Sequence, residues 1–198
     1  ELKTPIALVK AYSMGIKDGL DDGTYVDTII KQTDQISNLI EELLRFSKLE
    51  RDILQKEEFP IEPLVQSILD KHQIELDSKE INLQVNCNAG DTIVYADLNK
   101  MRMVFQNLIS NAIKYTANQN IIITLEDRNK SIYFQIKNGI PTDKIKDIEK
   151  IWEPFYVLES GTGLGLAIVK SILERHGFEY GVSSIDREIQ FYINVKKD

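Results

Sequence analysis

Three glycines near the C-terminal end alternate with small or apolar residues in the segment Gly161-Thr162-Gly163-Leu164-Gly165-Leu166. An apolar helical pattern follows directly and runs to about Arg175, and Gly177 is expected to end it. Glycine lets a backbone approach a ligand closely and adopt positive φ. The helix after the loop points its free N–H groups and its positive dipole end back at that loop. Together the loop and the helix predict a site for a polyphosphate.

The glycine spacing matches neither of two well-known phosphate loops. A dinucleotide fingerprint G-x-G-x-x-G requires glycine at position 166, where this chain has Leu166. A P-loop ends in G-K-[ST], whereas Lys170 and Ser171 lie two turns inside the predicted helix. Because a loop that merely enters a helix has the same composition, the hypothesis requires a second phosphate or metal element elsewhere.

A second candidate element lies on a helix predicted from Leu98 to about Tyr115, with Asp97 as its N-cap. Asn107, Asn111 and Lys114 are spaced i, i+4 and i+7, so they share one face of that helix. An amide oxygen is a neutral, hard ligand that suits Mg²⁺, and a lysine suits a phosphate. Taken alone, the same stripe is also what an ordinary solvated helix face contains.

Composition limits the classes of function. The chain has 198 residues, 42% of them hydrophobic, and a formal net charge of -7, which argues against nucleic-acid partners and against adhesion to anionic membranes. A single cysteine, Cys87, rules out an intrachain disulfide and favours a reducing compartment; its strand-like surroundings predict a buried thiol. No apolar run reaches the roughly 18 residues of a membrane span.

The first fifty residues predict two helices joined by a turn at 19–24. In the first, apolar residues recur at alternating spacings of four and three, and the second runs from about Tyr25 to about Leu49. One hairpin cannot bury so wide an apolar stripe, so we expect a dimeric four-helix bundle. Pro5 is either a first-turn proline or a kink. Because the sequence begins inside a helical pattern, we expect it to be a fragment of a longer protein.

The rest of the chain alternates between strand and helix patterns. Residues 55–58 have the composition of a solvated linker. We expect strands at 59–61, 81–87, 93–96, 121–125, 131–137, 178–185 and 188–195, and helices at 61–76, 98–115 and from the glycine loop to 175. The prediction is an α+β chain: a helical hairpin at 1–54, then at 55–198 an α/β sandwich in which three helices cover one mixed sheet.

Four motifs in a fixed order resemble the boxes of sensor histidine kinases. The segment 107–115 (N-x-x-x-N-A-x-K-Y) resembles their N box, 152–156 (W-E-P-F-Y) their F box and 161–166 (G-T-G-L-G-L) their G2 box. The segment 1–5 (E-L-K-T-P), at the head of a helical hairpin, resembles their H box without its histidine. The resemblance covers nearly the whole chain and implies a dimerisation and phosphoacceptor hairpin followed by a GHKL (Bergerat) ATP-binding domain.

The resemblance implies ATP and Mg²⁺ as ligands and assigns roles to individual residues. Asn111 would ligate the Mg²⁺ that bridges the ATP phosphates, with support from Asn107. Lys114 and Tyr115 would contact phosphate and nucleotide. The other residues that it implies for the ATP site are Asn138, Gly139, Phe155, Gly161, Thr162, Gly163, Leu164, Gly165 and Leu166.

Two segments depart from the family pattern. Asn138 falls near the adenine-reading position of the G1 box, where family members usually have Asp, and the segment 138–141 is shorter than the usual D-x-G-x-G. An Asn can still accept a hydrogen bond from the adenine amino group through its amide oxygen. Only residues 157–160 lie between the F box and Gly161, so the ATP lid is either naturally short for this family or partly absent from this sequence.

At the head of the hairpin, the resemblance implies that Glu1 acts as general base and that Thr4, one turn on, orients the water that dephosphorylates the partner protein. The acceptor histidine is expected immediately before Glu1, and the chain does not contain it. Neither His72, predicted at the surface of a helix, nor His176, predicted to cap a helix C-terminus, fits that role.

The resemblance therefore implies a kinase core that phosphorylates a histidine of its hairpin, passes the phosphoryl group to an aspartate of a response regulator, and also dephosphorylates that regulator. It implies a homodimer within a protein anchored in the bacterial plasma membrane, with this part on the cytoplasmic side. The alternatives are another GHKL ATPase, of gyrase or mismatch-repair type, and a non-catalytic dimerisation and docking module with a degenerate nucleotide pocket.

Overall fold

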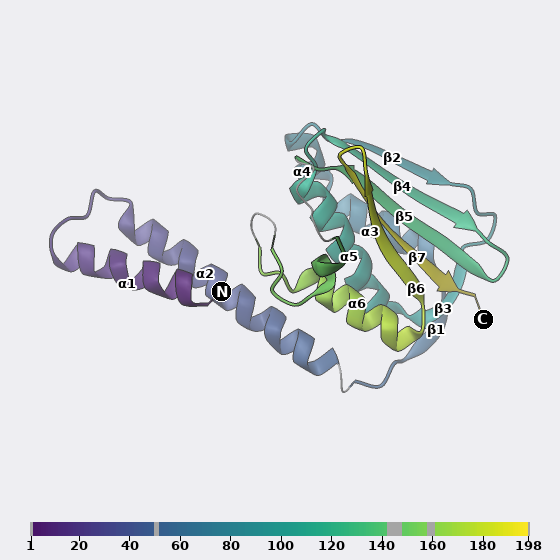
Figure 1. Ribbon diagram of the computed structural model, residues 1–198, viewed down its shortest axis with the longest axis horizontal. Coiled ribbons are helices and arrows are strands. Elements are labelled where there is room, and N and C mark those ends of the chain that lie inside the picture. The colour runs from purple at the N-terminus through teal and green to yellow at the C-terminus, as the bar shows by residue number, and fades with distance from the viewer. Residues whose placement is uncertain (1, 50–51, 142–147, 158–160, 198) are drawn as a thin grey trace.

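A helical hairpin projects from an α/β unit in the computed structural model, which describes residues 2–49, 52–141, 148–157 and 161–197 (Figure 1). The hairpin consists of α1 (Lys3–Lys17) and α2 (Tyr25–Leu49), the latter with the predicted bounds. Pro5 lies in the first described turn of α1, and Leu2 before it also has helical φ and ψ. The carboxylates of Asp21 and Asp22 accept backbone hydrogen bonds that shape the turn between the helices.

The hairpin buries few of its apolar side chains within a single chain. Pro5, Leu39 and Leu49 are the buried residues of its described helices. Many apolar side chains along its length are instead exposed: Ile6, Leu8, Met14, Ile16, Leu20, Val26, Ile30, Ile40 and Leu44. An apolar surface of this extent on two adjacent helices is typical of a face that packs against another protein surface.

The α/β unit contains a five-stranded sheet with the strand order β2-β4-β5-β7-β6. The pair β2–β4 is parallel and the other neighbours are antiparallel, so the sheet is mixed, as expected. Helices α3, α5 and α6 cover one of its faces and leave the other open (Figure 1). The strands are β2 (Asn82–Cys87), β4 (Asn120–Asp127), β5 (Ser131–Gly139), β6 (Glu179–Ile185) and β7 (Glu188–Lys196), and the helices are α3 (Ile61–Lys71), α5 (Leu98–Tyr115) and α6 (Gly165–His176).

Three details of the sequence-based prediction were wrong. Residues 56–58 are not a linker, because they belong to strand β1 (Lys56–Pro60), which pairs antiparallel with β3 (Ile93–Asp97). This pair forms a sheet of its own beside the five-stranded one. The helix predicted over 61–76 is interrupted at His72, where α3 ends and the short α4 (Gln73–Ser78) begins. Cys87 is half-buried on an edge strand rather than buried.

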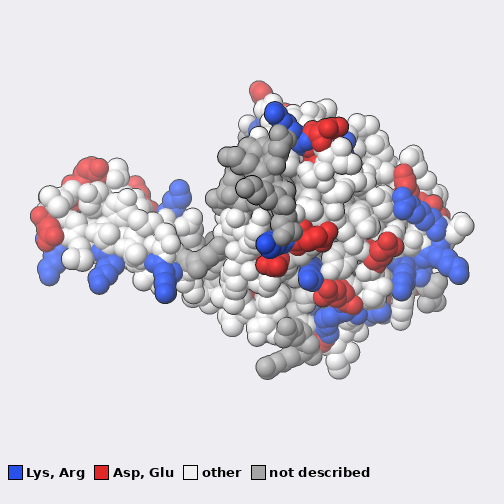
Figure 2. All heavy atoms as spheres, in the orientation of Figure 1, with Lys and Arg blue, Asp and Glu red and all other residues white. Residues whose placement is uncertain are grey.

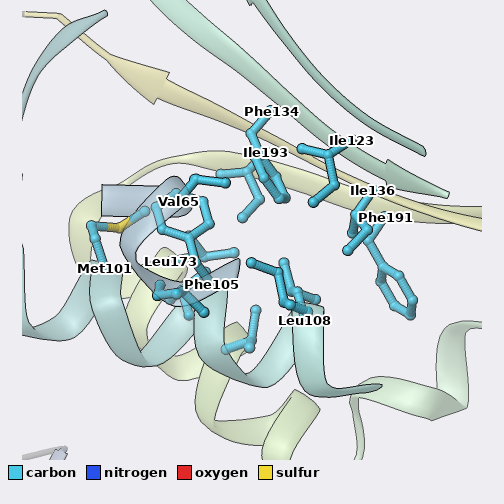
Figure 3. Packing of buried hydrophobic residues seen from close by; sticks show 14 of the residues in the cluster. Val65, Met101, Phe105, Leu108, Ile123, Phe134, Ile136, Leu173, Phe191 and Ile193 are labelled. Atoms are coloured by element: carbon cyan, nitrogen blue, oxygen red, sulfur yellow. The ribbon is translucent and has the colours of Figure 1, made fainter. Parts of the chain in front are cut away.

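Apolar side chains of the sheet and the three covering helices form one core (Figure 3). Phe105 of α5 lies against Phe134 of β5, with ring centroids 4.8 Å apart. Alternate residues of β5 and β7 point into this core, as the period of two in their burial shows. The core therefore fixes the orientation of α5, and with it the polar face that α5 turns away from the sheet. Among the described residues, no helix is long and apolar enough to cross a bilayer.

Asp97 joins three segments at the base of the unit. Its carboxylate caps α5 by accepting from the Lys100 N–H at 3.0 Å, as predicted, and also accepts from the Gln55 N–H at 2.9 Å. Its own N–H donates to Nε2 of His176 at 3.1 Å. Nδ1 of His176 lies 2.7 Å from the Ile172 carbonyl, which can only accept. His176 is thus a buried, neutral imidazole that links α6 to β3, a contact that its predicted position at the C-terminus of a helix did not indicate.

We expect the free energy of unfolding to fall between about pH 7.5 and about pH 5.5 because of His176. Burial lowers the pKa of His176, although the Ile172 carbonyl opposes this effect. A lowered folded-state pKa means that the folded protein binds fewer protons than the unfolded chain. The contribution of the neutral His176 to the free energy of unfolding is therefore complete above the unfolded-state pKa of about 6.5. It is lost as the pH falls towards the lower pKa of His176 in the folded protein.

Urea unfolding at the two pH values measures this effect. His176→Gln, which does not titrate in this range, should show a smaller difference between them. His72→Gln, at a half-exposed histidine beside Glu75, is the control and should retain the full difference. An equal pH dependence in the wild type and His176→Gln would assign the effect to other groups.

Candidate functional site

A cavity of about 290 Å³ lies between α5, α6 and the end of the sheet. Its wall combines polar groups of α5, the glycine loop that precedes α6, and apolar side chains of β7 and of the segment that follows η1 (Ile148–Trp152). The polar face of α5 and the glycine loop, which the sequence predicted as two parts of one site, therefore line the same cavity. The predicted site residues that line it are Asn107, Asn111, Lys114, Tyr115, Asn138, Gly161, Thr162, Gly163, Gly165 and Leu166.

The polar wall is the predicted face of α5. Residues Asn107, Asn111 and Lys114 face the cavity because the opposite side of the helix is held in the core by Phe105 and Leu108. The Asn107 amide nitrogen donates to the Met103 carbonyl at 3.0 Å, which fixes the direction of the side chain. The Lys114 ammonium lies over the Tyr115 ring, 4.9 Å from its centroid.

The opposite wall is the glycine loop. Gly161 and Gly163 both have positive φ, 130° and 66°. A Cβ on Gly161 would lie 3.0 Å from the Tyr115 hydroxyl, and one on Gly165 would lie 3.1 Å from Oδ1 of Asn107. The missing side chains thus let the loop approach the polar face of α5 closely. Helix α6 begins at Gly165, at the end of this loop, so its first backbone N–H groups lie where a phosphate site requires them.

Asn138 lines the cavity near the end of β5. It is buried, and its amide nitrogen donates to the Gly139 carbonyl at 3.0 Å. Its neighbours in the sheet are Ile121 and Ile189, so the carboxamide is a polar group in largely apolar surroundings. A single amide among apolar side chains can give a directional hydrogen bond, which suits recognition of a planar ligand.

Three predicted site residues lie outside the cavity lining. Phe155 exposes 47% of its surface, and only its backbone supports the loop, through an N–H that donates to the Gly163 carbonyl at 2.9 Å. Leu164 is fully buried in the core. Gly139 is covered by the Asn118 side chain, which lies where a Cβ would be. These three residues were predicted as site residues because they belong to the family motifs. A motif does not record the direction in which each of its side chains points.

Thr4, one of the two catalytic residues expected on the hairpin, is not among the residues that line this cavity. Thr4 lines a second hollow, which α1, α2 and the glycine loop enclose together. The two hollows share Val157, Gly161 and Thr162, and also Glu42 of α2. Glu1 lies outside the described residues, so its predicted role as general base remains a prediction.

Sequence reasoning missed several lining residues. Ser110 could have been found, since it follows Asn107 by three residues on the same helix face. Tyr156 belongs to the F-box motif but was not singled out as a ligand contact. Glu42 had no local signal, because it reaches the cavity from the hairpin, 120 residues away in sequence from its partner Thr162.

The donor atoms of the cavity fit a nucleotide-bound Mg²⁺ better than a metal cage made of protein. Among the residues described here, no group of three or more His, Cys, Asp or Glu side chains could hold a metal ion. Mg²⁺ in nucleotide sites takes only one or two protein oxygens and completes its shell with phosphates and water. Amide oxygens such as those of Asn107 and Asn111 match that requirement.

On the face that Figure 2 shows, Lys and Arg are interspersed with Asp and Glu.

Two family models match the chain. The model described as "Histidine kinase-, DNA gyrase B-, and HSP90-like ATPase" matches residues 96–198, slightly more than half of the chain. The model described as "His Kinase A (phospho-acceptor) domain" matches residues 1–52. The two matches occur in the order that the four motifs indicate.

Curated relatives with similar sequences are sensor kinases. Sensor histidine protein kinase HK06 of Streptococcus pneumoniae is 31% identical over 206 residues, covering 98% of this chain and 45% of its own length. Sensor protein SrrB of Staphylococcus aureus is 28% identical, covering 100% of this chain and 36% of its own. Sensor histidine kinase WalK of Bacillus subtilis is 27% identical, with coverage of 94% and 33%. The chain thus spans less than half the length of these relatives.

Solved structures with the same architecture come from proteins of the same kind. The Acinetobacter baumannii histidine kinase AdeS has a TM-score of 0.83 and 26% identity, covering 100% of this chain and 98% of its own. Histidine kinase ThkA, in a complex with the response regulator protein TrrA, has a TM-score of 0.84 and 25% identity, covering 100% of this chain and 59% of its own. The similarity therefore extends over the hairpin and the α/β unit together.

Proposed function

Since the chain belongs to the sensor histidine kinases of two-component systems, we propose that it binds Mg-ATP in the cavity between α5 and the glycine loop and phosphorylates a histidine of its hairpin. That histidine is the one that the resemblance places immediately before Glu1. The domains that we propose are a phosphoacceptor hairpin at 1–54 and an ATP-binding domain at 55–198.

The observation that carries the proposal is the shared cavity of the asparagine face and the triple-glycine loop. The phosphates would lie between the loop with the first N–H groups of α6 on one side and Asn107, Asn111 and Lys114 on the other. The adenine would occupy the apolar slot beside Ile189 and Phe191, where the amide oxygen of Asn138 can accept from its amino group. Mg²⁺, held through Asn111, would neutralise charge on the phosphates.

Phosphoryl transfer requires positioning and charge neutralisation more than covalent chemistry. The hollow lined by Thr4 adjoins the glycine loop, so the H-box region and the phosphate site of one chain face the same space. We propose that Glu1 acts there as general base. In a separate hydrolytic reaction, Thr4 would orient the water that attacks the phosphoryl group of the regulator, so that inorganic phosphate and the free aspartate carboxylate are released.

The proposed partners are a second copy of the chain and a response regulator. The exposed apolar side chains of α1 and α2 would be buried in a four-helix bundle made by two hairpins. The response regulator would carry the acceptor aspartate, and the complex of ThkA with TrrA supports a partner of this class. The sensor region and membrane anchor would lie in further parts of the protein.

Asn111→Ala is the direct test of the nucleotide site. We expect the dissociation constant for a non-hydrolysable ATP analogue, measured calorimetrically with Mg²⁺, to rise by about 30-fold or more. With EDTA in place of Mg²⁺, the wild type and Asn111→Ala should have nearly the same dissociation constant for the analogue, because Asn111 acts through the metal.

Asn99→Ala, at an exposed asparagine in the first turn of the same helix, is the matched control and should bind like the wild type. A wild-type chain that binds no analogue would favour the non-catalytic docking module. Unchanged affinity in Asn111→Ala would remove this residue from the site.

A further inference from the structure

The nucleotide cavity has one wall that does not belong to the ATPase unit. Glu42 of α2 lines the cavity, and its carboxylate accepts a hydrogen bond from the hydroxyl of Thr162, in the middle of the glycine loop. The same hydroxyl oxygen accepts from the N–H of Leu164 at 3.3 Å. Thr162 thus gives its only hydroxyl proton to the hairpin, so that proton is not available to a ligand.

Glu42 differs in charge from the other groups that line the nucleotide cavity. Among the described residues that line the cavity, it is the only carboxylate, and the other polar groups are amides, hydroxyls and the ammonium of Lys114. A triphosphate brings several negative charges to the same loop. A carboxylate beside these charges is repelled, and the repulsion is strong where the surroundings are partly shielded from water.

The other end of α6 is attached to the hairpin as well. The Arg175 guanidinium, in the last turn of α6, donates to the carbonyls of Leu49 and Asp52, just where α2 ends. Lys100 forms an ion pair with Asp52 at 2.7 Å. Helix α6 is therefore held against α2 at two points, by Thr162 before its first turn and by Arg175 in its last.

From this geometry, and on the basis of the proposed nucleotide site, we propose that Glu42 is a phosphate-sensing residue that the hairpin contributes to that site. Its carboxylate and the nucleotide phosphates compete for the Thr162 loop. Nucleotide binding then breaks the Glu42–Thr162 contact and releases one end of α6 from α2, while Arg175 remains as a pivot. Because coupling between two equilibria is reciprocal, docking of the hairpin weakens nucleotide binding to the same extent.

The first test compares nucleotide affinities in the full chain with Mg²⁺ present. Glu42→Gln removes the charge and retains the shape, and we expect it to tighten binding of a non-hydrolysable ATP analogue by about three- to tenfold. The gain should be smaller for ADP and close to absent for adenosine, because the repulsion acts on the phosphates. Glu41→Gln is the matched control, since Glu41 is the adjacent residue, outside the nucleotide cavity, and pairs with Arg45.

The second test measures the docking itself by the distance between two spin labels. One label is placed at Lys31→Cys on α2 and the other at Ser184→Cys on β6, both exposed positions, in a Cys87→Ser background. Addition of the ATP analogue should shift and broaden the distance distribution. Glu42→Ala, which removes the acceptor of the Thr162 hydroxyl, should change the distance distribution in the same direction without nucleotide.

Several results would overturn the inference. Weaker binding of the ATP analogue by Glu42→Gln would mean that the carboxylate helps to hold the Mg-nucleotide. An equal change for the analogue, ADP and adenosine would indicate a general structural effect, and an unchanged distance distribution would exclude release of α6. If the wild type binds no nucleotide, the proposed function itself fails, whereas normal binding with no effect of Glu42→Gln removes only the role of Glu42.

Discussion

Gly163→Ala is expected to weaken binding of an ATP analogue by about 100-fold while the protein remains folded. Gly163 has φ of 66°, and a Cβ there would lie 2.5 Å from the carbonyl carbon of Phe155 and 2.6 Å from its Cα. These are backbone atoms, held by the hydrogen bond from the Phe155 N–H to the Gly163 carbonyl. The loop must therefore move as a whole, away from the position from which it faces Asn107 and Lys114.

Calorimetric titration with Mg²⁺ and the analogue measures the loss, and far-UV circular dichroism checks that the fold is intact. Gly90→Ala is the control, because Gly90 lacks positive φ and has no atoms within 4 Å of a built Cβ. Its affinity should equal that of the wild type. If Gly163→Ala binds the analogue normally, the close approach of this loop is not what makes the site.

Phe105→Ala is expected to lower the free energy of unfolding of the α/β unit by about 3–5 kcal/mol. Phe105 is 0% exposed and packs on Phe134, which comes from the central part of the sheet. Truncation leaves a cavity between α5 and the sheet, and the tightly packed neighbours can fill it only in part. Since α5 carries the asparagine face, we also expect weaker nucleotide binding in this variant.

Urea unfolding followed by the fluorescence of Trp152 measures this change, because the only tryptophan of the chain lies in this unit, against Phe191 and Tyr180. The control is Ile74→Ala in α4, where the side chain is 86% exposed, and it should change the free energy by no more than about 0.5 kcal/mol. A loss below about 1 kcal/mol for Phe105→Ala would show that this part of the core is loosely packed.

Local sequence signals determined most of the elements. The bounds of α2, the Asp97 cap of α5 and the end of α6 at Gly177, with φ of 67°, were predicted because each depends on residues within a few positions of one another. Helix periodicity also placed Asn107, Asn111 and Lys114 on one face, and glycine spacing identified the loop opposite. Most of the polar residues that line the cavity could therefore be identified before the fold was known.

The tertiary structure decided what depends on partners distant in sequence. Residues 56–58 are charged and show no strand periodicity, yet they form β1 because β3 offers them a pairing edge. His176 is buried because β3 brings the Asp97 N–H to it. Glu42 reaches the cavity between α5 and the glycine loop only because α2 packs along α6. Periodicity reports which face of an element is apolar, but which distant group lies against that face is fixed by packing, and no local pattern records it.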